Sequence, residues 1–447
     1  MSSSAKVLLV FPRAFEQNTV PPLGISLLAS CLQDAGHEVD LLDLTVEPLH
    51  RLDFNDYCLV GMTLLCTNFP NGTDLARRIR REARTVSIVA GGPFADSCPR
   101  EVLDTGAFDI VAHGEGERIL PQLVAALKSS TEYTDIGGLS FYRDGQIVRT
   151  PSPPMIANLD DLPFPAYDLL PMRLYPRHSI MASRGCPWDC IFCDRGPSES
   201  RRMRYLSPDR VRDWAARIVR DFDYKPIRML DSTFTVNQRW AEQICDGIIE
   251  SGLGIHWHCQ SRIDCVNPGL LKKMRAAGCT QIVAGIDSGN DEILTLSQKG
   301  LTKAEARRGA QLFRDGEAPQ LHLNFVIGHP WDTLESIQET VDFADELESE
   351  FGAQCGFYMM VPFPGTELWD NAPKYEIEIN KDWDKFNKLS FMGTPERLSA
   401  TFNSKYLRAE ELTRVYHAIF ERKASASSRS LRRDADPAGL SMLVVHT

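Results

Sequence analysis

The stretch Cys186-Pro187-Trp188-Asp189-Cys190-Ile191-Phe192-Cys193 places three thiols within eight residues, with three residues between the first pair and two between the second. An apolar segment and an Arg184-Gly185 turn come directly before it. Thiolates at this density are typical of a soft metal or an iron–sulfur cluster. A cluster of four irons needs four ligands, so three cysteines would leave one iron open to a substrate or cofactor.

Two simpler explanations compete with a cluster: a structural zinc site and three buried thiols. Zinc sites usually combine one closely spaced cysteine pair with a second pair of ligands further on, and no second pair lies at such spacing near Cys186. Disulfides belong to oxidising compartments, and nothing in the sequence suggests secretion. We therefore expect Cys186, Cys190 and Cys193 to hold a 4Fe–4S cluster.

Length and composition limit the remaining possibilities. With 447 residues, 43% of them hydrophobic and 24% charged, the chain is long enough for two or three domains with sizeable cores. A net charge of −11 argues against a broad nucleic-acid surface. The twelve cysteines, without a secretory leader pattern after Met1, favour a reducing cytoplasm. No apolar run reaches the ~18 residues that span a membrane, so we expect a cytoplasmic protein that binds neither membranes nor nucleic acid.

The N-terminal part predicts an α/β fold. Residues 1–136 alternate short apolar runs with helical patterns, which indicates a Rossmann-like parallel sheet. The expected strands are residues 7–11, 39–43, 59–63, 87–90 and 109–112. A helix should begin after Pro21-Pro22 and end at Gly36. Glycine-rich turns follow the later strands, at the sheet edge where such folds bind ligands.

The rest of the chain predicts a connector and a second α/β domain. Residues 137–175 should form a linker with a hairpin that turns at Asp144-Gly145. Residues 176–390 should form a partial (β/α)6 barrel of the TIM type. Its expected strands are residues 179–183, 227–232, 255–261, 281–287, 320–327 and 356–362. Residues 391–447 should be a small helical region, with a helix over 410–423 and a disordered tail from residue 423.

Alternation along two of the barrel strands is unusual. His256, His258, Gln260 and Arg262 share one face of the third strand, and His322 and Asn324 alternate with apolar neighbours in the fifth. The interior of a closed barrel normally packs branched aliphatic side chains. The pattern therefore predicts a polar lumen that holds a polar molecule. The alternative is that these histidines bind one another or face solvent.

Several motifs, in their order and spacing, resemble one enzyme family. They are Pro21-Pro22-Leu23-Gly24, Gly36-His37-Glu38-Val39, Gly91-Gly92-Pro93, the run from Asp109 to Glu117, the linker from Leu159 to Ala166, and Pro362-Phe363-Pro364-Gly365-Thr366-Glu367-Leu368. Together with the cysteine run, residues 6 to about 370 resemble the radical S-adenosylmethionine (SAM) enzymes with an N-terminal cobalamin-binding domain. In that family the open iron binds the amino and carboxylate groups of SAM, and one electron cleaves SAM to a 5′-deoxyadenosyl radical.

The resemblance implies a set of SAM-binding residues. It places Phe192 near the adenine, Asp231 at the SAM amino group, and Asp287 near the ribose, where many members have Glu. Arg262 and Gly328 also match positions close to SAM. The alternative for all five is that they serve strand-end packing and turn geometry.

The resemblance also implies cobalamin, although the D-x-H-x-x-G box that ligates cobalt in other cobalamin enzymes is absent. Many members of the subclass lack this box, and the loop Thr63-Leu64-Leu65-Cys66-Thr67-Asn68 would face the lower side of cobalt. The implied cobalamin-binding residues are Leu23, Gly24, Thr63, Cys66, Gly91, Gly92, Gly114, Glu115 and Gly116. The alternative is a vestigial domain that keeps the fold without the cofactor.

Two reactions follow from the resemblance. The first is C-methylation, through cobalamin, of a small natural-product or sugar-derived molecule; the second is radical dehydration or deoxygenation of a hydroxylated, aminoglycoside-like molecule. His258, His329 and Tyr358 are the candidate catalytic acids or bases. Both reactions need an external one-electron reductant of the flavodoxin or ferredoxin type. An RNA- or protein-modifying methylthiotransferase is less compatible with the acidic chain and its scattered N-terminal cysteines, and a non-enzymatic metal- or cobalamin-binding protein is a further alternative.

Overall fold

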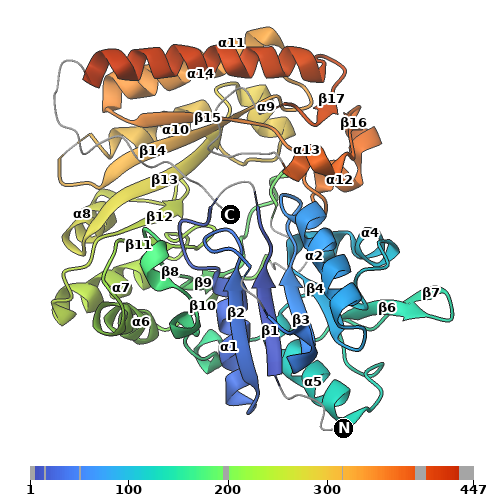
Figure 1. Cartoon of the computed structure of the whole chain (residues 1–447). Coiled ribbons are helices and arrows are strands. Elements are labelled where there is room, and N and C mark those ends of the chain that lie inside the picture. Colours follow the sequence, from blue (N-terminus) through green and yellow to red (C-terminus); the bar gives the residue numbers. More distant parts are fainter. Residues whose placement is uncertain are drawn as a thin grey trace. The chain divides into compact units, whose positions relative to one another are not determined.

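The computed structural model describes residues 6–14, 17–49, 52–194, 201–314, 316–387 and 399–431, with side chains up to residue 423 (Figure 1). The chain divides into two compact units. One contains Met1–Pro187 and Arg195–Lys225, and the other contains Trp188–Asp194 and Pro226–Thr447. Each unit is built around its own mainly parallel sheet.

The first unit contains a seven-stranded sheet in the order β2-β1-β3-β4-β5-β6-β7. Its first five strands in the chain run parallel to one another, and all five expected strands are confirmed. They are β1 (Lys6–Phe11), β2 (Glu38–Asp43), β3 (Tyr57–Thr63), β4 (Ser87–Gly91) and β5 (Ile110–Ala112). Because parallel strands end at one edge, the turns after β3, β4 and β5 share that edge.

The hairpin expected in the connector is present and extends the first sheet. Strands β6 (Leu139–Arg143) and β7 (Gln146–Arg149) are antiparallel, and β6 pairs with β5. Asp144 and Gly145 form the turn with φ of 50° and 75°, as a two-residue hairpin turn of the mirror-image type requires. The hairpin is therefore part of the sheet of the first unit.

The helices described in the first unit are α1 (Leu23–Asp34), α2 (Phe69–Glu82), α3 (Pro93–Ser97), α4 (Pro99–Asp104), α5 (Gly116–Ser129) and α6 (Pro208–Asp221). Short 3₁₀ turns lie at Phe54–Asp56, Leu159–Asp161, Tyr167–Leu169 and Met172–Leu174. Helix α1 begins after Pro22 and is followed by Gly36 at φ 81°, as expected. Ile25 of α1 and Leu123 of α5 share one buried core with the sheet.

The second sheet has six strands in the order β15-β14-β13-β12-β11-β8. They are β8 (His178–Ile180), β11 (Ile227–Met229), β12 (Trp257–Ser261), β13 (Cys279–Asp287), β14 (Gln320–Ile327) and β15 (Gln354–Met359). Strands β11 to β15, which belong to the second unit, pair in parallel throughout, as the partial-barrel prediction requires. The expected second strand, residues 227–232, is shorter and ends at Met229.

The first barrel strand, expected over residues 179–183, is interrupted. Only β8 joins the six-stranded sheet, and Ser183 and Arg184 form a separate strand, β9. Strand β9 pairs antiparallel with β10 (Arg204–Tyr205) instead. The prediction was wrong here because the partner of residues 183–184 lies on the far side of the cysteine stretch, which local periodicity does not reveal.

The second unit carries the remaining helices. They are α7 (Gln238–Ser251), α8 (Pro268–Ala276), α9 (Asp291–Leu296), α10 (Lys303–Gln311), α11 (Leu334–Phe351), α12 (Glu367–Asp370), α13 (Trp383–Asn387) and α14 (Ala409–Leu431), with a 3₁₀ turn at Ala372–Tyr375 and a small ladder of β16 (Glu378–Ile379) and β17 (Phe402–Asn403). Across the described part of the chain, no helix is both long and apolar enough to cross a bilayer.

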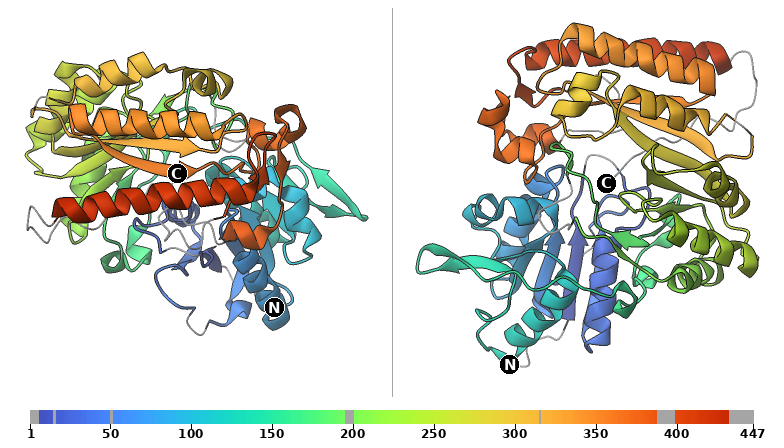
Figure 2. Two further views of the ribbon diagram at one scale, coloured as in Figure 1. Left: turned by 90° about the horizontal axis from the view of Figure 1, so that it is seen from above. Right: turned by 180° about the vertical axis from the view of Figure 1, so that it is seen from behind.

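The C-terminal helix is longer than expected. The prediction of disorder from residue 423 is wrong up to Leu431, where α14 ends, while residues 432–436 lie outside the described part. Lys423 of α14 pairs with Asp345 at 2.9 Å and Glu348 at 2.7 Å, both on α11, and the two helices lie side by side (Figure 2). These contacts with α11 give α14 tertiary support that its composition did not indicate. The expected domain boundary at residue 390 falls in the segment 388–398, which is not described.

Candidate active site

The cysteine stretch follows β9 directly, and its middle is anchored by a buried isoleucine. Ile191 is 3% exposed, its N–H donates to the carbonyl of Ser297 at 3.2 Å, and its carbonyl accepts from Leu368 at 2.9 Å. The N–H of Cys193 donates to the carbonyl of Cys190 at 3.2 Å, which closes a turn between these two cysteines. All three cysteines of the stretch are half-exposed and none is in a disulfide.

The donor chemistry of this stretch suits an iron–sulfur cluster. Among the described residues, no three His, Cys, Asp or Glu side chains converge on a single metal ion. A four-iron cluster binds each thiolate through a different iron, so its ligands need not converge on one point. Two buried cations, Lys299 and Arg262, interact electrostatically with Cys190. Positive charge next to a thiolate stabilises the deprotonated form that binds metal.

Lys299 is held by a buried carboxylate. Its Nζ lies 2.5 Å from Oδ2 of Asp287, and the two side chains are 10% and 8% exposed. Burial lowers the pKa of Lys299, but the carboxylate of Asp287 and the thiolate of Cys190 outweigh it, so the pKa is raised. The amine therefore stays charged at neutral pH.

The position of Asp287 depends on an irregular strand end. Its φ is 72°, in the left-handed region that non-glycine residues rarely adopt, and the register of β13 shifts between Gly285 and Asp287. A Cβ at Gly285 would lie 3.1 Å from both Oδ1 of Asp287 and Nζ of Lys299. A glycine at 285 thus leaves room for the pair, and strain at such a site is typical of a functional position.

Arg262, at the end of β12, donates four hydrogen bonds to protein groups. Its Nε and Nη2 donate to the carboxylate of Asp264, each at 2.9 Å. Its Nη1 donates to the carbonyl of Lys299 at 2.7 Å, and its Nη2 also donates to that of Gly300 at 2.8 Å. The guanidinium also lies over the ring of Trp188, 4.4 Å from its centroid. Arg262 therefore ties the end of β12 to the cysteine stretch.

The buried carboxylate of Asp332 closes the turn after β14. Oδ2 of Asp332 accepts from the N–H groups of Gly328 and His329 at 2.8 and 2.9 Å. Gly328 has φ 87°, and a Cβ there would lie 2.3 Å from Leu412 of α14. The ring of His329 meets the edge of Phe192 with centroids 5.2 Å apart, and burial lowers the pKa of His329.

The structure thus places four of the five expected SAM-binding residues in contact with the cysteine stretch or with groups that contact it. Phe192 packs on His329, Arg262 on Trp188, and Gly328 precedes His329 in the turn. Asp287 reaches the stretch through Lys299. The fifth, Asp231, is completely buried just after β11.

The predicted alternation on the barrel strands is confirmed. Trp257 and Cys259 are fully buried, whereas His258 and Gln260 are half-buried. On β14, the ring of Phe325 packs against Phe343 of α11, so the apolar face of this strand is the one that α11 covers. The polar side chains of β14 therefore lie on the face opposite α11.

Two polar groups on this inner face lack partners. Neither ring nitrogen of His322, which is 2% exposed, makes a hydrogen bond of normal geometry with any described residue, and neither does Oδ1 of Asn324. Burial lowers the pKa of His322 to about 4, although Asn324 and Gln354 nearby oppose that shift. A Cβ at Gly356 would lie 3.2 Å from Nε2 of His322 and 3.5 Å from the ring of Tyr358, so these residues form one cluster.

The expected cobalamin residues lie at the carboxyl edge of the first sheet. Gly92 has φ 90°, and a Cβ there would lie 3.0 Å from the carbonyl of Leu64. A Cβ at Gly24 or Gly114 would meet nothing within 4 Å, and one at Gly91 only a carbonyl 3.9 Å away. These turns expose backbone that a large ligand could approach closely, so they fit a cobalamin cradle.

Two further residues shape this edge, and neither is among the predicted cobalamin-binding residues. Asn68 is completely buried; its Oδ1 accepts from Leu65 N–H at 2.8 Å and its Nδ2 donates to the carbonyl of Thr63 at 3.2 Å, which closes the loop that contains the buried Cys66. His113 contacts Asp96 at 2.9 Å and Ser140 at 2.8 Å through its two ring nitrogens. Because both nitrogens are occupied, His113 is not available as a cobalt ligand.

Glu115 and Glu117 face arginines rather than the glycine turns. Glu115 accepts from Arg184 at 2.7 Å and from Arg204 at 2.8 and 3.0 Å, and Glu117 accepts from Arg184 at 2.5 Å. Gly116 packs closely on Leu28 of α1, since a Cβ there would lie 3.0 Å from that side chain. In this structure these residues therefore hold protein groups.

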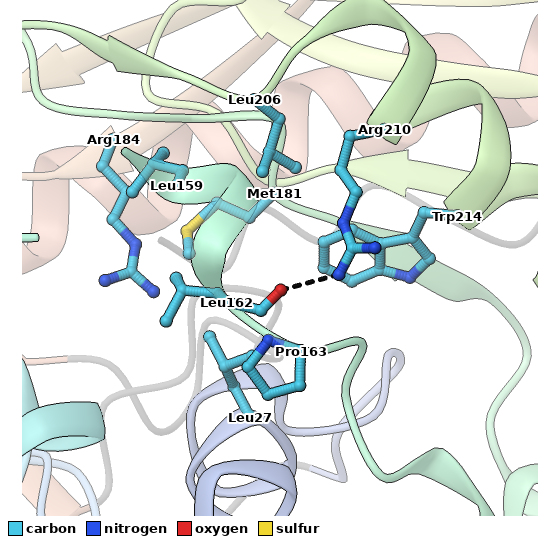
Figure 3. A pocket seen from close by; sticks show the side chains of 9 residues that line it. All are labelled: Leu27, Leu159, Leu162, Pro163, Met181, Arg184, Leu206, Arg210 and Trp214. Atoms are coloured by element: carbon cyan, nitrogen blue, oxygen red, sulfur yellow. Dashed lines mark hydrogen bonds between the residues drawn. The ribbon is translucent and has the colours of Figure 1, made fainter. Parts of the chain in front are cut away.

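A small apolar pocket also lies in the first unit (Figure 3). Its lining residues are Leu27, Leu159, Leu162, Pro163, Met181, Arg184, Leu206, Arg210 and Trp214. Arg210 donates to the carbonyl of Leu162 at 2.6 Å and lies over the ring of Phe164, 3.6 Å from its centroid. Arg210 thus holds the proline-rich connector and Arg184 binds Glu115 and Glu117, so the pocket is not a candidate for the reaction site.

Comparison with known proteins places this arrangement in a family. A family model of the B12 binding domain matches residues 16–124, and the model of the radical SAM superfamily matches residues 180–344. An uncharacterised methyltransferase of Pyrococcus horikoshii is 31% identical over 423 residues, which cover 90% of this chain and 91% of that protein. The hopanoid C-3 methylase of Methylococcus capsulatus is 27% identical over 365 residues, covering 78% of this chain and 68% of the methylase.

A solved structure supports the same fold. The radical SAM methyltransferase TsrM of Kitasatospora setae, determined with cobalamin and a 4Fe–4S cluster bound, has a TM-score of 0.71 to this chain. The two are 20% identical, and the match covers 85% of this chain and 81% of TsrM. This chain therefore belongs to the radical SAM enzymes with an N-terminal B12-binding domain, the family of cobalamin-dependent methyltransferases whose cofactors are a 4Fe–4S cluster, SAM and cobalamin.

Proposed function

We propose that this enzyme transfers a methyl group to a carbon atom of a small, polar and uncharged molecule. Hydrogen-bonding groups on the inner face of the second sheet bind this molecule. Membership of the family supports methyl transfer, and the polar side chains of β14 support the substrate class. Neither ring nitrogen of His322 nor Oδ1 of Asn324 makes a hydrogen bond of normal geometry with a described residue, and both side chains lie on the face of the sheet opposite α11. Buried polar atoms normally form hydrogen bonds, so buried atoms without one on this face indicate a place where a ligand binds.

The chemistry of the cluster of inner-face residues defines the substrate class. With a pKa of about 4, His322 is neutral at pH 7 and offers one donor and one acceptor. Burial raises the pKa of Tyr358 to about 12, so its hydroxyl stays protonated. A substrate hydroxyl or amide could donate to Oδ1 of Asn324 and accept from His322. An ionised group would find no opposite charge on these three side chains.

The other predicted site residues bind the three cofactors. Cys186, Cys190 and Cys193 hold the cluster, which when bound supplies the electron that cleaves SAM, while cobalamin carries the methyl group. Phe192, Asp231, Arg262, Asp287 and Gly328 form the SAM site, in which Arg262 acts by positioning Trp188. Leu23, Gly24, Thr63, Cys66, Gly91, Gly92 and Gly114 line the cobalamin site.

His258, His329 and Tyr358 serve here as polar contacts rather than as acids or bases. Radical methylation removes a substrate hydrogen as an atom, so no proton acceptor is required at the reacting carbon. The lowered pKa of His329 and the raised pKa of Tyr358 keep both groups neutral near pH 7. This fits a role in orienting a neutral substrate beside the cysteine stretch.

Anaerobic reconstitution separates methyl transfer from the dehydration alternative, which the relatives do not favour. We expect protein reconstituted with iron, sulfide and cobalamin to retain both iron and cobalt, and its product to gain one CH2. Omitting cobalamin should leave 5′-deoxyadenosine formation intact but remove the mass gain. Iron without cobalt, together with loss of water from the substrate, would instead support dehydration.

Replacing His322 and Asn324 with apolar residues tests whether these side chains bind the substrate. We expect His322→Leu and Asn324→Leu to stabilise the protein by about 1 kcal/mol or more against urea, because an unsatisfied buried polar group costs about 1–3 kcal/mol. Both variants should nevertheless lose methyl transfer at subsaturating substrate. Gln320→Leu, at an exposed position on the same strand, should change stability by less than about 0.5 kcal/mol. Destabilisation by both variants would mean that the two groups are structural.

The proposal also includes an electron donor and a cellular compartment. The electron should come from a small external reductant of the flavodoxin or ferredoxin type. A cluster that leaves one iron open is sensitive to oxygen, which favours function in a reducing cytoplasm. Reduction of the cluster by purified flavodoxin, followed by EPR spectroscopy, checks the first of these.

A further inference from the structure

The chain carries a buried arginine on each side of the cysteine stretch. Arg184 of β9 and Arg204 of β10 are directly paired in the antiparallel ladder, so their side chains extend from the same face. Their side chains are 12% and 6% exposed. Two guanidinium groups this close and this buried would repel each other strongly without anions between them.

The anions come from the turn that follows β5. Oε1 of Glu115 accepts from Arg184 at 2.7 Å and from Arg204 at 2.8 Å, so one carboxylate bridges both arginines. Glu117 accepts from the second Nη of Arg184 at 2.5 Å. The N–H of Ile156 donates to Glu115 Oε2 at 2.6 Å, and the carbonyl of Ile156 accepts from Arg204 at 2.7 Å. All five residues belong to the first unit.

The two glutamates are rigidly placed. Glu115 is the N-cap residue of α5 and Glu117 lies in the first turn of that helix. Helix α5 is fixed in the core of the first unit by Ile119 and Leu123, which are 1% and 0% exposed. The arginines are thus held on a rigid element of the domain that matches the B12-binding model.

The charges of the network support one another. Burial raises the pKa of Glu115, but the N–H of Ile156 and the two arginines outweigh it, and the pKa is lowered. Burial lowers the pKa of Arg184, but both glutamates outweigh it, and the pKa is raised. Glu115 and Arg184 therefore both carry their charge at neutral pH.

We propose that Glu115 and Glu117 are positioning residues for the cluster, clamping the chain on both sides of the cysteine stretch through Arg184 and Arg204. Cys186 lies only two residues beyond Arg184, so displacement of the clamp moves a cluster ligand directly. The middle of the stretch has a separate anchor at Ile191. This role is independent of any contact between Glu115 and cobalamin, and of which group the enzyme transfers.

Two variants test the clamp: one removes the charge of Glu115, and the other replaces the guanidinium of Arg184. Glu115→Gln keeps the shape of the side chain and its bond to Ile156 but removes the charge. Arg184→Lys keeps the charge but cannot reach both carboxylates with a planar fork. Asp43→Asn is the matched control, since Asp43 is completely buried in the same unit and accepts from Asn18, Thr45 and Tyr175.

The readouts are iron per chain, the EPR signal of the reduced cluster with and without SAM, and 5′-deoxyadenosine per iron. We expect Glu115→Gln and Arg184→Lys to broaden the EPR signal, to weaken its response to SAM, and to lower 5′-deoxyadenosine per iron about ten- to hundred-fold, as small displacements at a reacting centre do. Asp43→Asn should keep the wild-type signal even where it lowers the melting temperature by the same amount.

Two results would overturn the clamp. One is a wild-type EPR signal and wild-type cleavage in both clamp variants; the other is an identical change in Asp43→Asn, which would indicate general loss of stability. If Glu115→Gln does not fold, Glu117→Gln, which removes a single contact, carries the same test. These measurements need no methyl acceptor, so they stay informative whether or not the proposed methyl transfer is correct.

Discussion

Cys190→Ala is expected to abolish the iron-derived absorbance and all reductive cleavage of SAM, and Cys186→Ala and Cys193→Ala should do the same. With only two protein thiolates, a cubane loses an iron ligand that no neighbouring residue is expected to replace. Cys190 has the strongest local support, since Lys299 and Arg262 interact with it and Arg262 also holds Trp188 beside it. Iron analysis and mass spectrometry of 5′-deoxyadenosine after anaerobic reconstitution measure the loss.

Cysteines outside the stretch provide the control for this experiment. Cys265 and Cys58 are half-exposed, like the three proposed ligands, and belong to no such run. Cys265→Ala and Cys58→Ala should retain wild-type iron and wild-type cleavage. Undiminished cleavage in any one of the three stretch variants would remove that cysteine from the set of ligands.

Local sequence patterns predicted the first sheet closely because each of its strands is a compact apolar run between turn residues. Residues 7–11 show this well, since β1 is buried along its whole middle and differs from the expectation by one residue. The second sheet was predicted less closely at its beginning. Residues 183–184 pair with residues 204–205 across the cysteine stretch, and a pairing between distant segments leaves no periodic signal.

The site was predicted at the level of motifs but not at the level of its ion pairs. The cysteine run and the alternation of His258 and Gln260 could be read directly from spacing. The partner of Asp287, Lys299, follows it by twelve residues across a short helix, and only the fold brings the two together. Glu115 illustrates the same limit, because its motif resembles a cofactor turn while its carboxylate binds two arginines of β9 and β10.

Lys299→Met is expected to cost about 3–5 kcal/mol of unfolding free energy, because it leaves the carboxylate of Asp287 buried without its cation. The pair is 2.5 Å apart and nearly inaccessible to solvent, so screening by water does not reduce this figure. Since the pKa of Lys299 is raised, the contribution of the pair is present at neutral pH and is lost only as the pH rises through that raised value. Urea unfolding at pH 7 measures the cost.

An exposed ion pair is the control for this loss. Lys273 lies 3.0 Å from Asp246 with side chains 33% and 48% exposed, so Lys273→Met should cost less than about 1 kcal/mol. If Lys299→Met costs no more than Lys273→Met, the buried pair does not stabilise the fold in the way described.

The double variant Lys299→Met/Asp287→Asn separates the fold from the chemistry. It leaves no unpaired charge, so we expect it to recover most of the stability lost in the single variant. It should not recover SAM cleavage, because Asp287 is proposed to contact the SAM ribose and because Lys299 provides positive charge beside Cys190, which favours reduction of a cluster. A double variant with both wild-type stability and wild-type cleavage would mean that each charge of the pair only neutralises the other and has no role in the reaction. If the double variant recovers stability but not cleavage, the fold does not need the two charges. The strained backbone at Asp287, which positions its carboxylate, would then serve the reaction.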